Sequence, residues 1–117
     1  MSATVFGMPG CDTVKKGTDW LEAQGKAYER IDFSKVDGLE DRLQAWIEKA
    51  GLTNVLNTRA IVFKKLEARE QARLKSDAGA AAAAMVENPY LIKRPLLVTD
   101  SAVVPGFKPE TCEAALK

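Results

Sequence analysis

The first third of the chain alternates apolar and turn-forming segments in a way that is typical of a β-α-β unit. A short apolar run at residues 4–6 predicts a strand, and the Gly-Met-Pro-Gly sequence of residues 7–10 predicts a turn. Residues 12–23 favour a helix that ends at Gly25, and residues 28–33 predict a second extended segment. One helical face of the first run carries Val14, Gly17 and Leu21. Strand, helix and strand predict a parallel pair with a right-handed crossover.

The middle of the chain has helical periodicity. Residues 39–50 place apolar side chains at spacings i, i+4, i+7, i+8 and i+11, and Gly51 ends the pattern. These side chains are Leu39, Leu43, Trp46, Ile47 and Ala50. Residues 68–87, which include the alanine-rich tract 78–85, predict one continuous helix. Residues 88–89 then open a short turn or helix.

The last third predicts a hairpin followed by a helix. An apolar strand at residues 96–99 turns through residues 100–101 into a second strand at 102–104. A Pro-Gly pair ends the hairpin, and Pro109 is well placed to begin a helix that reaches Leu116. The element order is therefore β-α-β, then helices, then β-β-α, which predicts an α/β fold.

Size and composition indicate one ordinary domain. The chain has 117 residues, of which 46% are hydrophobic and 28% charged, with a net charge of +1. This charge is too small to indicate nucleic-acid binding. No apolar stretch approaches the ~20 residues that cross a bilayer, and no basic segment with a long apolar run begins the chain. We therefore expect a cytoplasmic monomer without membrane or nucleic-acid partners.

Cys11 is the residue whose position best indicates chemistry, because it immediately precedes the first helical run. A thiol at a helix start faces unpaired backbone N–H groups and the positive end of the macrodipole. Such sites lower a cysteine pKa to about 3.5–7.5. Lys15, or its neighbour Lys16, lies one turn further on and can add a cation. We favour a reactive thiol; the alternative is a small buried hydrophobe under a loop.

The rest of the sequence narrows how Cys11 can be activated. The chain has two cysteines and no histidine, so no metal site is expected, and Cys112 is interpreted as a packing residue. Without histidine, activation must come from the helix end and from arginine or lysine. Arg59 and Arg94 are the candidates, because a guanidinium binds oxyanions or carboxylates through two hydrogen bonds and stabilises a thiolate. The alternatives are a solvated loop position for Arg59 and a sheet-edge charge for Arg94.

The element order and four sequence blocks resemble the thioredoxin fold and, more narrowly, the arsenate reductase-like (ArsC/Spx) family, nearest to its YffB-type branch. The blocks are Gly10-Cys11-Asp12-Thr13-Val14-Lys15-Lys16, Leu56-Asn57-Thr58-Arg59, Ile92-Lys93-Arg94-Pro95-Leu96-Leu97 and Gly106-Phe107-Lys108-Pro109. The resemblance implies one thioredoxin-like domain over residues 1–117. Its four-stranded mixed sheet, with flanking helices, would carry a helical insertion at about residues 39–92, between the second and third strands.

The resemblance also implies a function. Cys11 corresponds to the catalytic nucleophile, Arg94 to an arginine before a cis-proline at Pro95, and Arg59 to a second anion-binding arginine. Lys15 is added as a further contact for an anion or glutathione. The expected activity is a single-cysteine, glutathione-dependent thiol–disulfide or oxyanion reductase, with glutathione as co-substrate, no bound cofactor, and glutaredoxin as a candidate protein partner.

Three departures from the family pattern limit these expectations. The third arginine of the arsenate reductases is replaced in the segment around Phe107 and Lys108, which weakens the case for arsenate as substrate. Val14 stands where many Spx regulators have a second cysteine, so their Cys-x-x-Cys switch is missing. Cys112 is a poor resolving cysteine on topology. The alternative function is an Spx-like regulator or adaptor that binds a protein partner, with Cys11 as redox sensor.

Overall fold

The computed structural model describes residues 3–8 and 10–106, and these fall into two compact units. The first unit contains the chain up to Val36 and again from Arg94 onward. The second unit is Asp37–Lys93. That residues 39–92 form an insertion in a single domain stays a prediction. Each unit is described separately below. The helix predicted at residues 109–116, and with it Cys112, lies outside the described residues.

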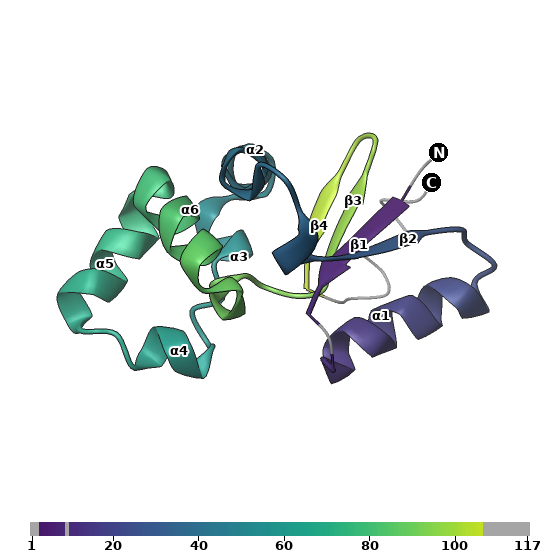
Figure 1. Ribbon diagram of the computed structural model, residues 1–117, viewed down its shortest axis with the longest axis horizontal. Helices are drawn as coiled ribbons and strands as arrows, with labels where there is room; N and C mark the ends of the chain where they lie inside the picture. The colour runs from purple at the N-terminus through teal and green to yellow at the C-terminus, as the bar shows by residue number, and fades with distance from the viewer. Residues whose placement is uncertain (1–2, 9, 107–117) are drawn as a thin grey trace. The chain divides into compact units, whose positions relative to one another are not determined.

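The first unit is built on a four-stranded mixed sheet (Figure 1). Its strands are β1 (Ala3–Gly7), β2 (Glu29–Asp32), β3 (Leu96–Thr99) and β4 (Val103–Pro105). Their order is β2-β1-β3-β4, with β2 parallel to β1 and the other two pairs antiparallel. The predicted mixed sheet and C-terminal hairpin are confirmed. The two central strands, β1 and β3, bury most of their side chains.

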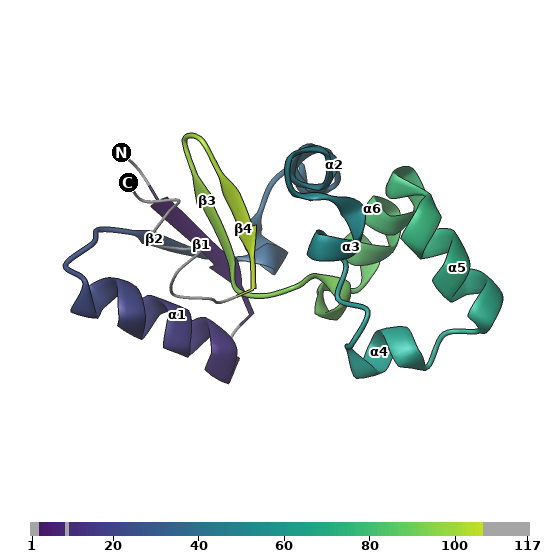
Figure 2. The same cartoon turned by 180° about the vertical axis from the view of Figure 1, so that it is seen from behind.

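Helix α1 (Asp12–Ala23) packs along the sheet, as Figures 1 and 2 show. Its buried face contains the three residues expected from the sequence and also Thr18. This face and the sheet form one apolar cluster, because alternate residues of a strand point to the same side. The cluster consists of Ala3, Val5, Val14, Leu21, Leu97 and Val104. Hydrophobic burial thus holds the start of α1 against the sheet.

The second extended segment is shorter than predicted. Strand β2 ends at Asp32, and a 3₁₀ helix, η1 (Phe33–Lys35), follows at once. Phe33 is buried and stacks on Phe6, with ring centroids 6.2 Å apart and planes 15° apart. The aromatic pair accounts for the early end of the strand, because Phe33 fills a core position in the turn rather than extending the ladder.

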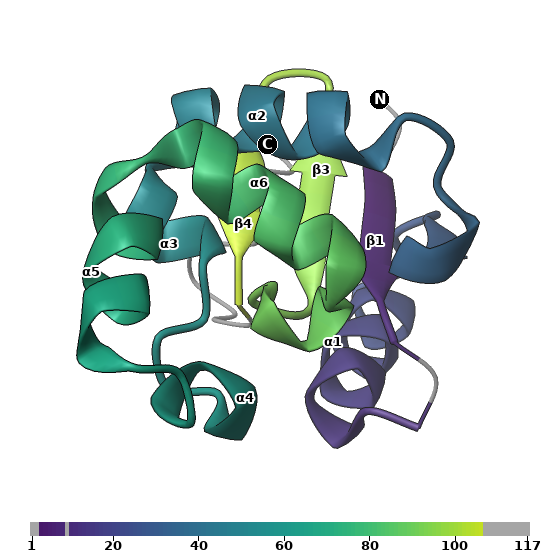
Figure 3. The ribbon, with the colours of Figure 1, turned by 60° about the vertical axis from the view of Figure 1, so that its left-hand side comes forward.

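The second unit is helical (Figure 3). Its α helices are α2 (Leu39–Ala50), α3 (Leu52–Val55), α4 (Ile61–Lys64), α5 (Ala68–Ser76) and α6 (Ala78–Glu87), and a 3₁₀ helix, η2 (Pro89–Leu91), follows. Helix α6 packs against both α2 and α5. The apolar stripe predicted for α2 is confirmed, since its first four members are buried and the last is half-buried.

The prediction of one continuous helix at residues 68–87 is wrong. The chain breaks at Asp77, whose backbone is extended, with φ −125° and ψ 103°. The Asp77 carboxylate accepts a hydrogen bond from the Ala80 N–H at 3.1 Å and so caps α6. An aspartate gains more from capping a new helix than from continuing an old one. The sequence prediction missed this cap because the alanine tract that follows has a high helix propensity.

Candidate active site

Cys11 occupies the position immediately before α1, in extended conformation with φ −88° and ψ 117°. Its carbonyl oxygen accepts the first helical hydrogen bond, from the Lys15 N–H at 3.1 Å. The preceding Gly10 has φ 72°, a left-handed conformation in which a side chain would be strained. This glycine lets the chain turn sharply from the sheet into the helix, so that Cys11 meets the open N–H groups of the first turn.

The Cys11 side chain lies at the edge of the apolar cluster but remains partly exposed. The alternative, a small buried hydrophobe under a loop, therefore fits the apolar contacts of Cys11 but not its partial exposure. Partial burial raises the pKa of the thiol, and this is the largest single influence. Hydrogen bonds from the Val14 N–H, the Arg94 side chain and the Thr13 N–H, together with the Arg94 charge, outweigh it. The net effect lowers the Cys11 pKa from its ordinary value of 9.0.

Arg94 reaches Cys11 from the segment that leads into β3. Its side chain is half-buried and is hydrogen-bonded to the thiol. The Arg94–Pro95 peptide bond is cis, which confirms the expectation for Pro95. Pro95 is buried, and its carbonyl oxygen accepts a hydrogen bond from the Gly106 N–H at 2.8 Å. Two segments far apart in the sequence therefore meet at the sulfur.

The other two predicted site residues have different surroundings. Lys15 lies close to the thiol on α1, but its Nζ is 2.8 Å from the Asp19 carboxylate, and both side chains are exposed. The Asp19 carboxylate offsets part of the attraction that the Lys15 ammonium would exert on an anionic substrate. Arg59 belongs to the second unit, where it is exposed and its N–H donates to the Asn57 side chain at 3.1 Å. Its contribution to an anion site stays a prediction.

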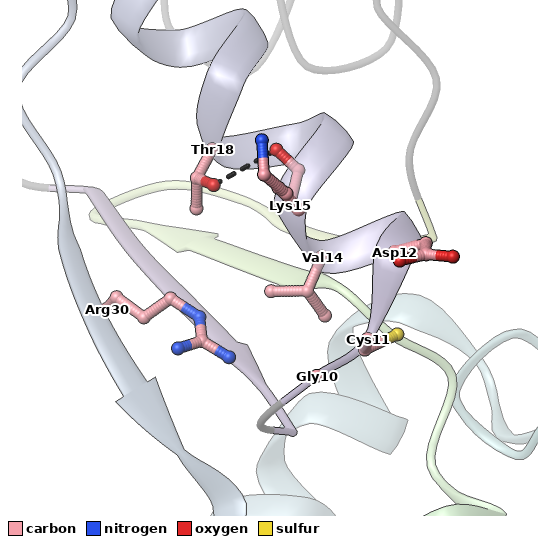
Figure 4. A pocket seen from close by; sticks show the side chains of 7 residues that line it. All are labelled: Gly10, Cys11, Asp12, Val14, Lys15, Thr18 and Arg30. Atoms are coloured by element: carbon pink, nitrogen blue, oxygen red, sulfur yellow. Dashed lines mark hydrogen bonds between the residues drawn. The ribbon is translucent and has the colours of Figure 1, made fainter.

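A cavity of about 270 Å³ opens beside Cys11, between the start of α1 and strand β2 (Figure 4). Its lining consists of Gly10, Cys11, Asp12, Val14, Lys15, Thr18 and Arg30. Figure 4 shows the Val14 methyl groups facing the Arg30 guanidinium across this space, whereas the Cys11 sulfur is directed away from Arg30. The thiol thus stands at the margin of the cavity rather than on its floor.

Sequence reasoning missed Arg30. In the parallel pairing of β1 and β2, Arg30 is the register partner of Val5. Paired residues of neighbouring strands project from the same face, so Arg30 shares the α1 side of the sheet with Val5. The sequence did show a charged residue inside a predicted strand. Without the register of the strand, however, the side of the sheet on which Arg30 lies could not be predicted.

Two further observations concern the described part of the chain. Within residues 3–8 and 10–106, no group of three or more potential ligands among His, Cys, Asp and Glu is arranged to hold a metal ion. Over the same residues, no helix is both long enough and apolar enough to cross a lipid bilayer.

Solved structures and curated sequences match nearly the whole chain. A structure named YffB is 33% identical, with a TM-score of 0.86, and the match covers 98% of this chain and 99% of that one. The solution structure of an arsenate reductase (ArsC) related protein from Brucella melitensis is 35% identical, with a TM-score of 0.77, covering 100% and 96%. An uncharacterised protein from Haemophilus influenzae is 34% identical over 113 residues, 96% of each chain. The thioredoxin-like fold expected from the resemblance is confirmed.

A regulator is also among the relatives. The regulatory protein MgsR of Bacillus subtilis is 27% identical over 108 residues, which cover 91% of this chain and 83% of MgsR. The relatives of this chain thus include a regulatory protein as well as an arsenate reductase-related protein. The ArsC family profile matches residues 6–115, and the chain belongs to the ArsC family.

Proposed function

We propose that this protein is a single-cysteine, glutathione-dependent thiol reductase that acts in the reducing cytoplasm. The Cys11 thiolate attacks the glutathione sulfur of a mixed disulfide, the original S–S bond breaks, and the substrate leaves as a thiol after taking up a proton. A second glutathione thiolate then attacks the Cys11–glutathione disulfide. Oxidised glutathione is released and Cys11 returns as a thiolate.

The observation that carries this proposal is the lowered pKa of a partly exposed Cys11 thiol. Thiolates, not thiols, are the nucleophiles in disulfide exchange, so a lower pKa increases the reactive fraction near neutral pH. Thr13 and Val14 hold the charge through backbone N–H groups, and Arg94 holds it through a hydrogen bond and a full charge. The same donors can stabilise the thiolate when it leaves the mixed disulfide.

A one-cysteine mechanism is supported by the residue three positions after Cys11. Val14 is buried and packs in the apolar cluster, so the helix carries no second thiol at the Cys-x-x-Cys position. We infer that an external thiol resolves the adduct, with glutathione itself or a glutaredoxin in that role. Arg94 is proposed to bind a glutathione carboxylate, or an oxyanion, beside Cys11, and the part of Arg59 in anion binding stays a prediction.

The test is turnover of the mixed disulfide between glutathione and 2-mercaptoethanol, followed by the formation of oxidised glutathione. Cys11→Ser should abolish the enzymatic rate, and Cys112→Ser is the matched control that should retain it. Alkylation by iodoacetamide at pH 6 should show the same contrast between the two variants. Fast alkylation of Cys112, or turnover that survives Cys11→Ser, would overturn the assignment.

The second candidate is a regulator that binds a protein partner, with Cys11 as an oxidation sensor. The similarity to MgsR favours it. It predicts a Cys11 that is oxidised or glutathionylated once and turns over slowly, whereas the reductase predicts repeated turnover with excess glutathione. Multiple-turnover measurements at a fixed enzyme concentration therefore separate the two.

A further inference from the structure

We propose that the cavity beside Cys11 binds a carboxylate group of the disulfide substrate and that Arg30 is the residue that selects for it. This inference rests on the proposed disulfide exchange at Cys11 and specifies its substrate class. Substrates would be disulfides of small thiols or peptides in which a carboxylate lies a few bonds from the sulfur. Neutral disulfides of similar size would react without help from this contact.

The placement of Arg30 follows from the register of the sheet. Its pairing with Val5 puts it on the face covered by α1, and its guanidinium faces the cavity (Figure 4). The volume of about 270 Å³ exceeds that of several water molecules, whose share of the liquid is about 30 Å³ each. The space can therefore take a group of amino-acid size.

The guanidinium is held in position before any ligand arrives. Arg30 Nη2 donates to the Met8 carbonyl oxygen at 2.9 Å and lies 3.3 Å from Asp32 Oδ1. The Asp32 oxygen is buried and makes no hydrogen bond in the described residues, so this second contact is electrostatic only. Both contacts use Nη2, and within the described part of the chain Nε and Nη1 make no hydrogen bond, so they can donate to a ligand. A fixed fork of donors matches a carboxylate in geometry and loses little entropy on binding.

The other charges around the cavity leave Arg30 as its main cation. Lys15 is paired with Asp19. Asp12 also lines the cavity, but Figure 4 shows its carboxylate directed away from Arg30. Asp32 offsets part of the Arg30 charge. We therefore expect a moderate selectivity for carboxylates, not an exclusive one.

The route from the sulfur to Arg30 passes Gly10. A β-carbon built on Gly10 would meet nothing within 4 Å, so this stretch of the cavity lining borders open space. The Cys11 sulfur faces away from Arg30, and a substrate must bend around the start of α1 to contact both. During exchange, the half of the disulfide that bonds to Cys11 would keep its carboxylate at Arg30 while the other half leaves as a thiolate.

The test compares two disulfides in single-turnover reactions with Cys112→Ser protein, in which Cys11 is the one remaining thiol. Glutathione disulfide carries carboxylates and 2-hydroxyethyl disulfide is neutral. Arg30→Met should slow the glutathione reaction about tenfold, equivalent to about 1.4 kcal/mol, and leave the neutral reaction within about twofold. Arg30→Lys should recover part of the loss, because it keeps the charge without the fork.

Two controls keep the outcome interpretable. The pH dependence of iodoacetamide alkylation reports the Cys11 pKa, and it should be the same with and without Arg30→Met, because the groups that shift this pKa are Val14, Thr13 and Arg94. In Cys112→Ser protein that retains Arg30, added salt should slow the reaction with glutathione disulfide and leave the reaction with 2-hydroxyethyl disulfide unchanged. This measurement needs no Arg30 variant.

Equal slowing of both disulfides would overturn the proposal, because Arg30 would then act only by holding the Met8 carbonyl. No change in either reaction would overturn it as well. The rate ratio can be measured even if catalytic turnover is absent. If Arg30→Met leaves the ratio of the two rates unchanged, the carboxylate site is refuted. If Arg30→Met lowers that ratio but the protein shows no catalytic turnover, the site is supported and only the proposed reductase function is refuted.

Discussion

The close contact between Gly7 and Val14 should control both stability and the position of Cys11. Gly7 ends β1, and Val14 lies in the first turn of α1. A β-carbon on Gly7 would lie 2.6 and 2.9 Å from the two Val14 methyl carbons, closer than nonbonded carbons approach. Gly7→Ala must therefore move Val14, and with it the helix start that donates N–H groups to the Cys11 sulfur.

The expected magnitudes follow from packing. Overpacking of this kind costs about 1–3 kcal/mol, offset by about 0.4–1 kcal/mol because alanine has less freedom than glycine when unfolded. Val14 is 2% exposed, so Val14→Ala should cost about 2 kcal/mol through two lost methyl groups and the space they leave. In the double variant the new methyl group occupies part of that space. The combined loss should fall short of the sum by about 1–2 kcal/mol.

A double-mutant cycle in urea measures this coupling, with circular dichroism and tryptophan fluorescence recorded together to check for a two-state transition. Iodoacetamide alkylation of the same four proteins reports on Cys11, whose reactivity should fall in Gly7→Ala and recover in the double variant. Losses in stability that add within about 0.5 kcal/mol would refute the reasoning, because they would mean that the two residues do not compete for space.

Two further predictions concern charge and capping. Because the Cys11 pKa is lower in the folded state, its thiolate stabilises the fold fully above the ordinary value of 9.0, and this stabilisation is lost as the pH falls through the folded value. The difference in unfolding free energy between wild type and Cys11→Ser should therefore grow with pH, and Arg94→Met should move the rise to higher pH; a pH-independent difference would contradict it. Asp77→Ala should lower stability by about 0.5–2 kcal/mol through loss of the hydrogen bond from Ala80, with Asp77→Asn as the control that keeps a cap. Equal losses in the two Asp77 variants, measured in urea, would argue against capping.

The sequence placed Cys11 at a helix start and named Arg94 as its neighbour, and the structure agrees on both positions. Cys11 could be placed because a strand, a glycine turn and a helical run define a helix start by local rules alone. Arg94 could be named because the family resemblance matches it to an arginine that precedes a cis-proline. The local signals failed where two preferences competed, as at Asp77, which suits both a helix surface and a cap. Local signals gave no indication of Arg30, because its position beside the cavity depends on its pairing with Val5 across the sheet.

By itself, then, the order of residues determined most of the element types, the apolar face of α1 and the position of Cys11 at a helix start. All of these depend on interactions between residues near one another along the chain. The tertiary structure alone decided that Arg94 would reach a sulfur 83 positions earlier in the numbering, and that Arg30 would line the cavity beside it. Such meetings depend on strand order and register, which are set when the whole apolar cluster packs and not by any single segment.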